Sequence, residues 1–405
     1  MMSSIQPIAG SITAPQGFMA QGVCAEIKKK DKRDLAVIYS RVPGSAAGVF
    51  TTNLVRAACV DVTRQHLANG QAQAIVANSG NANACNGEPG RTDTLQMAQT
   101  ASDVMGIEPD QILVASTGVI GLPMPMEKVE GGIWEAVLTM SRDGAHNAAL
   151  AIMTTDLLCK EIAVEIEIQG KPVRIGAIAK GSGMIHPNMA TMLCFITTDA
   201  NISSECLQNL LKHSVNQSFN MVSVDRDTST NDMVLILANG LARHEVIEVP
   251  GTPDYLLFQE ALDYITISLA KMIARDGEGA NHLVEVRVIN AAEMEAARVI
   301  ARSVVSSSLV KAAIFGHDPN WGRMLAAAGY SGADFDPAKT DIYLGQVQVA
   351  ADGTRLAFDE DAAVQELKKE NITITLDLKS GSHQATAWGC DLSYDYVSIN
   401  ADYRS

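Results

Sequence analysis

The longest regular pattern of apolar side chains in this chain has the spacing of an α-helix. Apolar residues recur every three or four positions over residues 254–275, which predicts an amphipathic helix with one face in the core. The run Asp276-Gly277-Glu278-Gly279 then predicts the end of that helix, because glycine disfavours helical backbone. The residues of the predicted buried face are Phe258, Leu262, Ile265, Leu269 and Met272.

Shorter apolar runs, many of them in pairs around polar turns, predict strands and hairpins elsewhere. The paired strands are expected at 162–168 with 173–178, at 345–350 with 355–358, and at 372–378 with 384–388. Further strands are expected at 111–116 and 283–289, and further helices at 95–105, 206–218 and 292–305. The last quarter of the chain is predicted to be mostly strands, and it closes on residues 396–403.

This mixture predicts the fold class. Helices and strands alternate, with substantial antiparallel pairing, so we expect an α/β (α+β) protein. The strict strand–helix–strand order of a Rossmann fold or a barrel is missing. A chain of 405 residues is too long for one small core, and two or three domains are expected.

Composition and charge narrow the class of function. A hydrophobic fraction of 47% and a charged fraction of 19% are ordinary for a globular protein and exclude a disordered chain. The net charge of -15 argues against nucleic acid as a partner, because phosphate binding needs a basic face. Small anionic substrates stay compatible with this charge if a local lysine or arginine offsets it.

Neither the first residues, the apolar stretches nor the cysteines predict an exported or membrane protein. Residues 1–17 lack a charged start followed by an apolar run, so we expect no secretory signal. No apolar stretch reaches the roughly 18 residues of a membrane span. The seven cysteines are scattered without a CxxC pair, which indicates reduced thiols in a cytoplasm and no zinc knuckle.

The segment from Lys180 to Thr191 carries the clearest candidate chemistry. A predicted strand ends at Lys180, a glycine-rich loop follows, and a second apolar strand begins at Met192. Thr191 therefore stands where a tight loop meets a strand. This arrangement suits an autocatalytic nucleophile, because a strained Ala190–Thr191 peptide is open to attack by the threonine hydroxyl through an N-to-O shift.

Cleavage at that peptide would leave Thr191 as a new N-terminus. Its α-amine, with a pKa of about 7.7–8.0 in model peptides, can take the proton of its own hydroxyl near neutral pH. The residues alone leave other interpretations open. An ordinary loop before a strand has the same pattern, and Lys180-Gly-Ser-Gly also resembles a phosphate loop, although its lysine precedes the glycines.

Three further polar motifs have a structural interpretation beside a functional one. His186 in the same loop is either catalytic or merely solvated. The stretch from Asp225 to Asp232 resembles a metal loop in composition, but it lacks the later glycine and glutamate of an EF-hand, so we interpret it as a polar turn. His317-Asp318 has no second histidine at ligand spacing, which favours a structural hydrogen bond over a zinc site. The sequence therefore predicts no metal.

Read together, the motifs identify a family. The stretch Lys180-Gly-Ser-Gly-Met-Ile-x-Pro-Asn-Met-Ala-Thr-Met-Leu closely resembles the processing site of the ornithine acetyltransferase (ArgJ) family. The resemblance runs the whole length of the chain. The other matching motifs are 50–53, 77–87, 115–121, 153–156, 223–232, 276–280, 316–323 and 399–404.

The resemblance implies an activity and a set of site residues. The family transfers acetyl from N2-acetyl-L-ornithine to L-glutamate through an acetyl ester on the nucleophile, which corresponds to Thr191, in cyclic arginine biosynthesis. Thr117 and Gly118 match its oxyanion hole, and Lys180 is the expected partner of the substrate carboxylate. The further substrate contacts implied are Thr154, Glu278, Asn400 and Ser405.

The family also implies a fold and an assembly. Its fold is an αββα layered sandwich, shared with self-processing aminopeptidases, with a smaller C-terminal α/β part at about 285–405. Cleavage would give fragments 1–190 and 191–405, and two copies of each would form a heterotetramer. No cofactor is implied. Some members also use acetyl-CoA as acetyl donor, and the sequence does not decide this.

Two rival functions come from other classes. A self-processing aminopeptidase or amidohydrolase on the same scaffold would use the same nucleophile and pass the acyl group to water. A binding protein without enzymatic activity would keep its chain intact. Ornithine release with and without glutamate distinguishes the first rival, and an uncleaved folded chain would favour the second.

Overall fold

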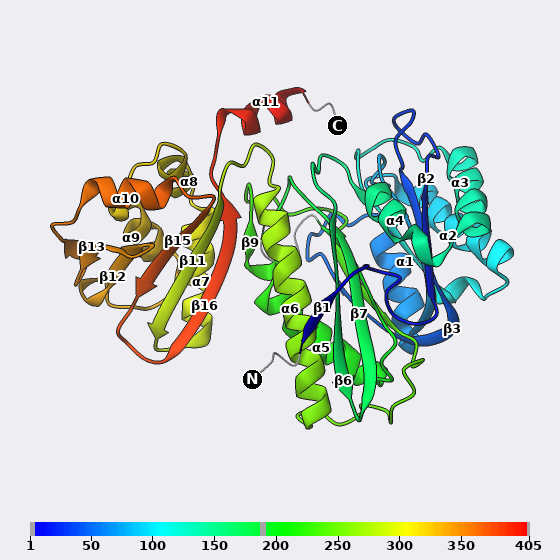
Figure 1. Cartoon of the computed structure of the whole chain (residues 1–405). Helices are drawn as coiled ribbons and strands as arrows, with labels where there is room; N and C mark the ends of the chain where they lie inside the picture. The colour runs from blue at the N-terminus through cyan, green and yellow to red at the C-terminus, as the bar shows by residue number, and fades with distance from the viewer. Residues whose placement is uncertain (1–4, 187–191, 403–405) are drawn as a thin grey trace.

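The protein is a mixed α/β molecule built around two β-sheets (Figure 1). The computed structural model describes residues 5–186 and 192–402. Within these residues, the first sheet has nine strands and the second has seven. The strands of the first sheet are β1 (Gln6–Ile8), β2 (Phe18–Val23), β3 (Leu35–Phe50), β4 (Gln71–Asn78), β5 (Ile112–Ser116), β6 (Lys160–Ile168), β7 (Lys171–Lys180), β8 (Leu193–Thr198) and β10 (Met233–Ala238).

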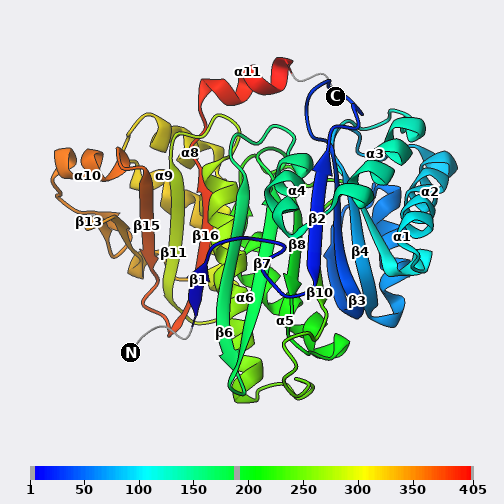
Figure 2. The same cartoon turned by 45° about the vertical axis from the view of Figure 1, so that its right-hand side comes forward.

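The long strand β3 holds the first sheet together. Its first half pairs with β2 over residues 35–40, and its second half pairs with β10 over residues 45–50. The register with β4 shifts between Tyr39 and Gly44, and such an irregularity bends a strand. The bend lets β3 connect two groups of strands, β2-β4-β5 and β6-β7-β8-β10 (Figure 2).

Strand β8 shows why the middle of the sheet is apolar throughout. Leu193 and Phe195 point into a core shared with β2 to β5, whereas Cys194 and Ile196 point into a core shared with helices. Successive side chains of a strand face opposite sides, so a strand between two cores is buried on both. The second of these cores is covered by α5 (Ser204–Gln217) and α6 (Pro253–Arg275).

The remaining helices of the first half lie around β2 to β5. Helices α3 and α4 pack on β2 and β3, and α1 and α2 pack on β5. The mixed α/β class and the layering of helices over sheets predicted from the sequence are confirmed. These helices are α1 (Ala58–His66), α2 (Gly87–Met105), α3 (Met126–Thr139) and α4 (Ala145–Ile152).

The second sheet forms the smaller C-terminal α/β part that the family resemblance implied. Helix α6 lies between the two sheets and packs on both (Figure 1). The strands are β9 (Val222–Ser223), β11 (Leu283–Ala291), β12 (Asp341–Leu344), β13 (Val347–Ala351), β14 (Thr354–Arg355), β15 (Asn371–Asp377) and β16 (His383–Cys390). Its helices are α7 (Met294–Ser306), α8 (Ser308–Phe315), α9 (Trp321–Gly329) and α10 (Glu360–Leu367), and α11 (Tyr394–Asp402) follows.

Several predicted boundaries were wrong for local reasons. The helix expected from residue 95 begins at Gly87, because a proline is tolerated in the first turn and polar residues face solvent there. The strand expected at 355–358 ends at Arg355, and residues 394–402 of the predicted strand-rich quarter are helical. Met272 of α6 is 37% exposed, whereas the other four residues of the predicted face are buried.

No helix within residues 5–186 and 192–402 is both long and apolar enough to cross a membrane.

Candidate functional site

One cavity of about 290 Å³ collects residues from widely separated segments. Every predicted site residue that the structure describes lines it, namely Thr117, Gly118, Thr154, Lys180, Glu278 and Asn400. Ala190, Thr191 and Ser405 lie outside the described residues. The rest of the wall consists of Ile120, Thr155, Gly183, Met184, Ser229, Thr230 and Asn231.

The Thr117–Gly118 loop begins where β5 ends. Gly118 has a φ of +132°, a backbone conformation that residues with a side chain rarely adopt. A Cβ at Gly118 would also lie 2.4 Å from the carbonyl carbon of Gly80. Only glycine therefore allows this loop to pack against the 80–81 peptide and to direct its backbone toward the cavity.

Asparagine side chains hold this loop in place. The Asn231 amide donates to the carbonyl oxygens of Ala82 at 2.6 Å and Ser116 at 2.8 Å. Asn81 donates in turn to the carbonyl of Leu122 at 3.1 Å. The asparagine-rich run from 78 to 86 thus supports the loop through hydrogen bonds and does not itself line the cavity.

Lys180 ends β7 and is buried, with 2% of its surface exposed. Its Nζ lies 3.5 Å from the Thr117 hydroxyl. Burial lowers the pKa of the Lys180 ammonium, whereas the nearby Asp156 opposes this shift. A cation held at the wall of a small cavity is suited to binding a carboxylate.

A buried ion cluster beneath the cavity joins three of its segments. Lys160 Nζ lies 2.8 Å from Asp156 Oδ1 and 2.6 Å from Asp276 Oδ2. The Asp156 carboxylate also accepts from the backbone N–H groups of Gly181, at 2.7 Å, and Thr154, at 3.0 Å. Burial alone would raise the pKa of Asp156, but the Lys180 and Lys160 ammonium groups hold it well below its usual range.

Asp232 anchors the strand that follows the predicted nucleophile. Its Oδ1 accepts from the backbone N–H of Met192 at 2.8 Å, next to residue 191 in the chain. Its Oδ2 is buried and has no hydrogen-bond partner among the described residues. Burial raises the pKa of the Asp232 carboxyl well above its ordinary value, with Lys180 acting in the opposite direction.

Glu278 and Asn400 close the cavity from the C-terminal side. The Asn400 amide, in α11, donates to Glu278 Oε2 at 2.8 Å. The backbone N–H of Glu278 donates to the carbonyl of Ser182 at 2.8 Å. A Cβ at Gly183 would lie 2.4 Å from the Glu278 carboxyl carbon, so glycine is needed for this close approach.

Sequence reasoning gave no role to several residues of this site. Asn231, Asp156, Asp276 and Asp232 all stood within motifs used to recognise the family, and that was the only signal available. No sequence signal marked Lys160, because a lysine at the start of a strand is usually solvent-exposed.

The other polar motifs make hydrogen bonds or ring contacts within the fold. The Asp225 carboxylate accepts from the N–H groups of Met184 and Ile185, so the 225–232 stretch is a polar turn that holds the 184–185 loop. His186 Nδ1 lies 3.2 Å from the Ser223 hydroxyl, and His317 stacks edge-on against His282. Within the described ranges, no group of three or more His, Cys, Asp or Glu side chains could hold a metal ion.

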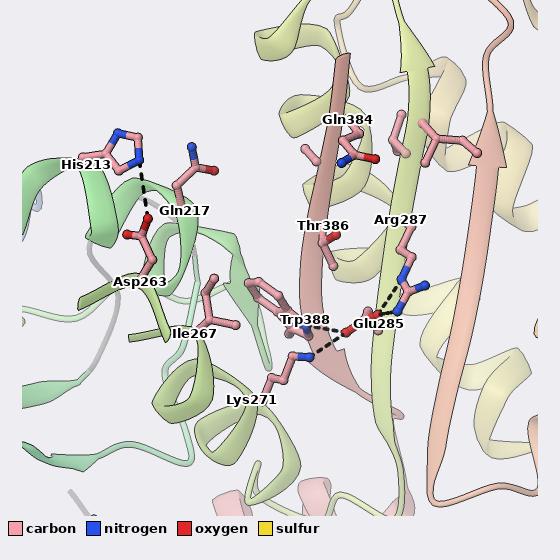
Figure 3. Close-up of a pocket in the computed structure, with 13 residues that line it drawn as sticks. His213, Gln217, Asp263, Ile267, Lys271, Glu285, Arg287, Gln384, Thr386 and Trp388 are labelled. Atoms are coloured by element: carbon pink, nitrogen blue, oxygen red, sulfur yellow. Dashed lines mark hydrogen bonds and ion pairs between the residues drawn. The ribbon is translucent and has the colours of Figure 1, made fainter. Parts of the chain in front are cut away.

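A second hollow, of about 560 Å³, lies between α5, α6 and the β11–β16 pair (Figure 3). Its charges neutralise one another: Glu285 pairs with Lys271 at 3.1 Å and with Arg287, and accepts from Trp388 Nε1 at 2.9 Å. None of the predicted site residues lines it. The smaller cavity is therefore the candidate functional site.

Comparisons with known proteins agree over almost the whole chain. The model of the ArgJ family matches residues 19–405. The arginine biosynthesis bifunctional protein ArgJ of Symbiobacterium thermophilum is 55% identical, covering 98% of this chain and 99% of the relative. The arginine biosynthesis bifunctional protein ArgJ of Caldanaerobacter subterraneus is 52% identical, again covering 98% of this chain and 99% of the relative.

A solved structure of arginine biosynthesis bifunctional protein argJ from Bacillus halodurans is also similar. It is 45% identical, with a TM-score of 0.50, and the match covers 52% of this chain and 98% of the solved chain. From these matches and the fold, the chain belongs to the ArgJ family.

Proposed function

We propose that this protein moves an acetyl group from N2-acetyl-L-ornithine to L-glutamate through an acetyl ester on Thr191, as an enzyme of the cyclic arginine pathway. Family membership supports the acetyltransferase activity. One observation carries the proposal for the site. The six described residues with an implied role line one small cavity. In addition, Asp232 accepts a hydrogen bond from the backbone N–H of Met192, the residue that follows Thr191.

The chain first cuts itself between Ala190 and Thr191. The Thr191 hydroxyl attacks the Ala190 carbonyl carbon, the peptide becomes an ester, and water releases residues 1–190 from residues 191–405. The solved Bacillus halodurans chain is compatible with this step, because nearly all of it (98%) matches only 52% of this chain, as a separate fragment of about half the length would. Strands of both fragments pair within the first sheet, which would keep them together.

Acetyl transfer then follows in two half-reactions. The Thr191 hydroxyl attacks the acetyl carbonyl, and its α-amine takes the proton. Thr117 and Gly118 stabilise the tetrahedral oxyanion, and ornithine leaves with the proton on its α-amine. The α-amine of glutamate next attacks the acetyl ester, forming N-acetylglutamate and restoring the hydroxyl.

The charges of the cavity suit both amino acids. Lys180 binds the α-carboxylate that ornithine and glutamate share. Glu278, oriented by Asn400, pairs with the side-chain amine of ornithine. Thr154 and Ser405 complete the substrate contacts, and acetyl-CoA is a second donor to be tested. We place the enzyme in the cytoplasm as a heterotetramer of two copies of each fragment.

The first test is the mass of the purified protein under denaturing conditions. Two species cut between Ala190 and Thr191 are expected, and Thr191→Ala should remain a single inactive chain. A wild-type chain that stays whole while transferring acetyl would exclude Thr191 as an N-terminal nucleophile.

Ornithine release distinguishes the transferase from the alternative hydrolase. N-acetylornithine supplied with glutamate should give ornithine and N-acetylglutamate in equal amounts. Equal ornithine release with and without glutamate would instead indicate an aminopeptidase or amidohydrolase that uses water as acceptor.

A further inference from the structure

Positive side chains surround a hollow at the end of the first sheet opposite the acetyl-transfer cavity. The hollow has a volume of about 630 Å³ and is lined by Arg41, Arg142, Lys171 and Arg243, together with polar Gln16 and apolar Leu241. No residue that lines it within the described chain is acidic.

The four cations come from four separate segments. Arg41 lies in the bend of β3, and Arg142 begins the short turn before α4. Lys171 is the first residue of β7, and Arg243 follows β10. Such a gathering is a product of the tertiary fold and not of a local basic run.

Among the described residues, these side chains stand without the ion pairs that several other cations of the protein form. None of the four forms an ion pair with a carboxylate among residues 5–186 and 192–402. By contrast, Arg174 on the same strand as Lys171 pairs with Glu165 at 2.9 Å. The cations of the hollow in Figure 3 likewise share Glu285.

Two carboxylates beside residues of the hollow, Asp199 and Asp143, do not line it. Asp199 accepts from the backbone N–H groups of Gln16 at 2.9 Å and Arg174 at 2.8 Å, one with each oxygen. Asp143 follows Arg142 in the chain and does not line the hollow. Four like charges therefore face one space in a protein whose net charge is -15.

The backbone at Arg243 adds a second, independent sign of constraint. Its φ is +59°, a left-handed conformation that favours glycine or asparagine. Strained backbone conformations cluster at active sites, ligand clamps and switch regions, and eleven other non-glycine residues of the described chain also have a positive φ. The arginine is thus kept where a smaller residue would fit the turn better.

We infer that this hollow binds a small molecule that carries a polyphosphate group, such as a nucleoside triphosphate. Arginine guanidinium groups match phosphate oxygens in paired hydrogen bonds, and three arginines with one lysine balance about four negative charges. The volume lies within the range of about 300–1,000 Å³ typical of small-molecule sites. Leu241 and Ala242 offer an apolar surface for the rest of the ligand.

The site is distinct from the acetyl-transfer cavity. Lys171 and Lys180 are the two ends of β7, a strand of 10 residues, which separates them by about 30 Å. The inference therefore does not depend on the proposed acetyl transfer.

Polyphosphate binding by the hollow can be tested by calorimetric titration of the full-length protein with ATP and with pyrophosphate. The titrations are done without divalent cations and at fixed ionic strength. We expect saturable binding of both, and at least a tenfold loss of affinity in Arg41→Gln/Arg243→Gln. The matched control Lys212→Gln/Lys368→Gln removes the same charge from exposed positions and should leave binding unchanged. Lys180→Met should also bind normally, which would place the ligand outside the acetyl-transfer cavity.

Three results would overturn the inference. One is a lack of saturable binding by wild type. Another is equal weakening in the control variant, which would indicate general electrostatic attraction. The third is an unchanged affinity in Arg41→Gln/Arg243→Gln, which would place the bound polyphosphate outside the hollow.

Discussion

The Lys160 ammonium and the Asp276 carboxylate lie 2.6 Å apart in the protein interior, although 116 positions separate them in the chain. Lys160 also contacts Asp156, at 2.8 Å, and the two carboxylates bind backbone N–H groups of the loops on either side. One buried cation thus fixes the loops that carry Thr154, Lys180 and Glu278.

Replacing Lys160 with methionine should therefore destabilise the fold strongly. It would leave the buried Asp276 carboxylate without its cation and Asp156 with Lys180 alone, and breaking a buried pair costs about 3–5 kcal/mol. Urea unfolding in the Thr191→Ala background, where a single chain is expected, measures the loss. As a control, Lys369→Met removes an exposed pair with Glu366 and should change stability by less than about 1 kcal/mol. Equal effects of the two variants would contradict the role of the cluster.

Lys180→Met should weaken the use of both substrates, because both carry an α-carboxylate. Loss of a buried charged partner costs about 2–5 kcal/mol, which corresponds to a fall in kcat/KM of about 30-fold or more. Steady-state kinetics with N-acetylornithine and with glutamate measure kcat/KM for each substrate. As a control, Lys171→Met at the other end of the same strand should leave kcat/KM unchanged for both substrates. If Lys180→Met kept the kcat/KM of the wild type, Lys180 would not bind the substrate carboxylate.

Thr117→Val should lower kcat while leaving KM nearly unchanged. The shape of the side chain stays the same, but the hydroxyl donor to the oxyanion is lost, and loss of one such donor costs about 10²–10³ in kcat. Thr139→Val on exposed α3 is the control. A change confined to KM would show that Thr117 binds substrate in its ground state.

Gly118→Ala should damage the oxyanion loop, whereas Gly131→Ala should be harmless. Alanine at Gly118 meets both a φ of +132° and a Cβ contact of 2.4 Å, so we expect a loss of about 2–4 kcal/mol. Gly131 is exposed within α3, with nothing within 4 Å of an added Cβ, and alanine there should stabilise by about 0.5–1 kcal/mol. Thermal unfolding of the two variants measures the difference. Similar melting temperatures would refute the close packing at Gly118.

His186 should make the protein less stable in mild acid. Burial, with Arg226 and Arg302, lowers the pKa of His186 to about 4, whereas the unfolded chain has a value of about 6.5. Between these values the unfolded state binds the extra proton, so stability falls as the pH drops from about 6.5 to 4. His186→Gln should reduce this dependence of melting temperature on pH. An unchanged slope would place the acid sensitivity elsewhere.

The sequence by itself determined the family and the fold class, and it named six residues that line one cavity in the structure. Helix α6 was predictable because Phe258, Leu262, Ile265 and Leu269 repeat at helical spacing and are all buried. The hairpin of β6 and β7 was predictable from alternation around a polar turn, and it set Lys180 at a strand end. Such periodicities are local, since they depend only on which side of an element faces the core.

The ends of some helices were difficult to predict from the sequence because local signals conflicted or were missing. The start of α2 at Gly87 was hidden because glycine and proline in its first turn are typical of loops. The final helix, α11, buries none of its described residues, so it has no apolar periodicity to read. The roles of all the site residues remain predictions from the family resemblance, and Ala190, Thr191 and Ser405 also lie outside the described residues.

Only the tertiary structure decided which charges meet. The Lys160 cluster and the cationic hollow each join segments that no spacing relates, because chain topology brings them together after the strands pair. A lysine in the sequence is expected in solvent. Long-range packing decides whether it is buried against Asp156, like Lys160, or lines a hollow with Arg243 and without an ion pair among the described residues, like Lys171. Local patterns record the side of an element that a residue occupies, whereas the partner across the fold is set by contacts between distant elements.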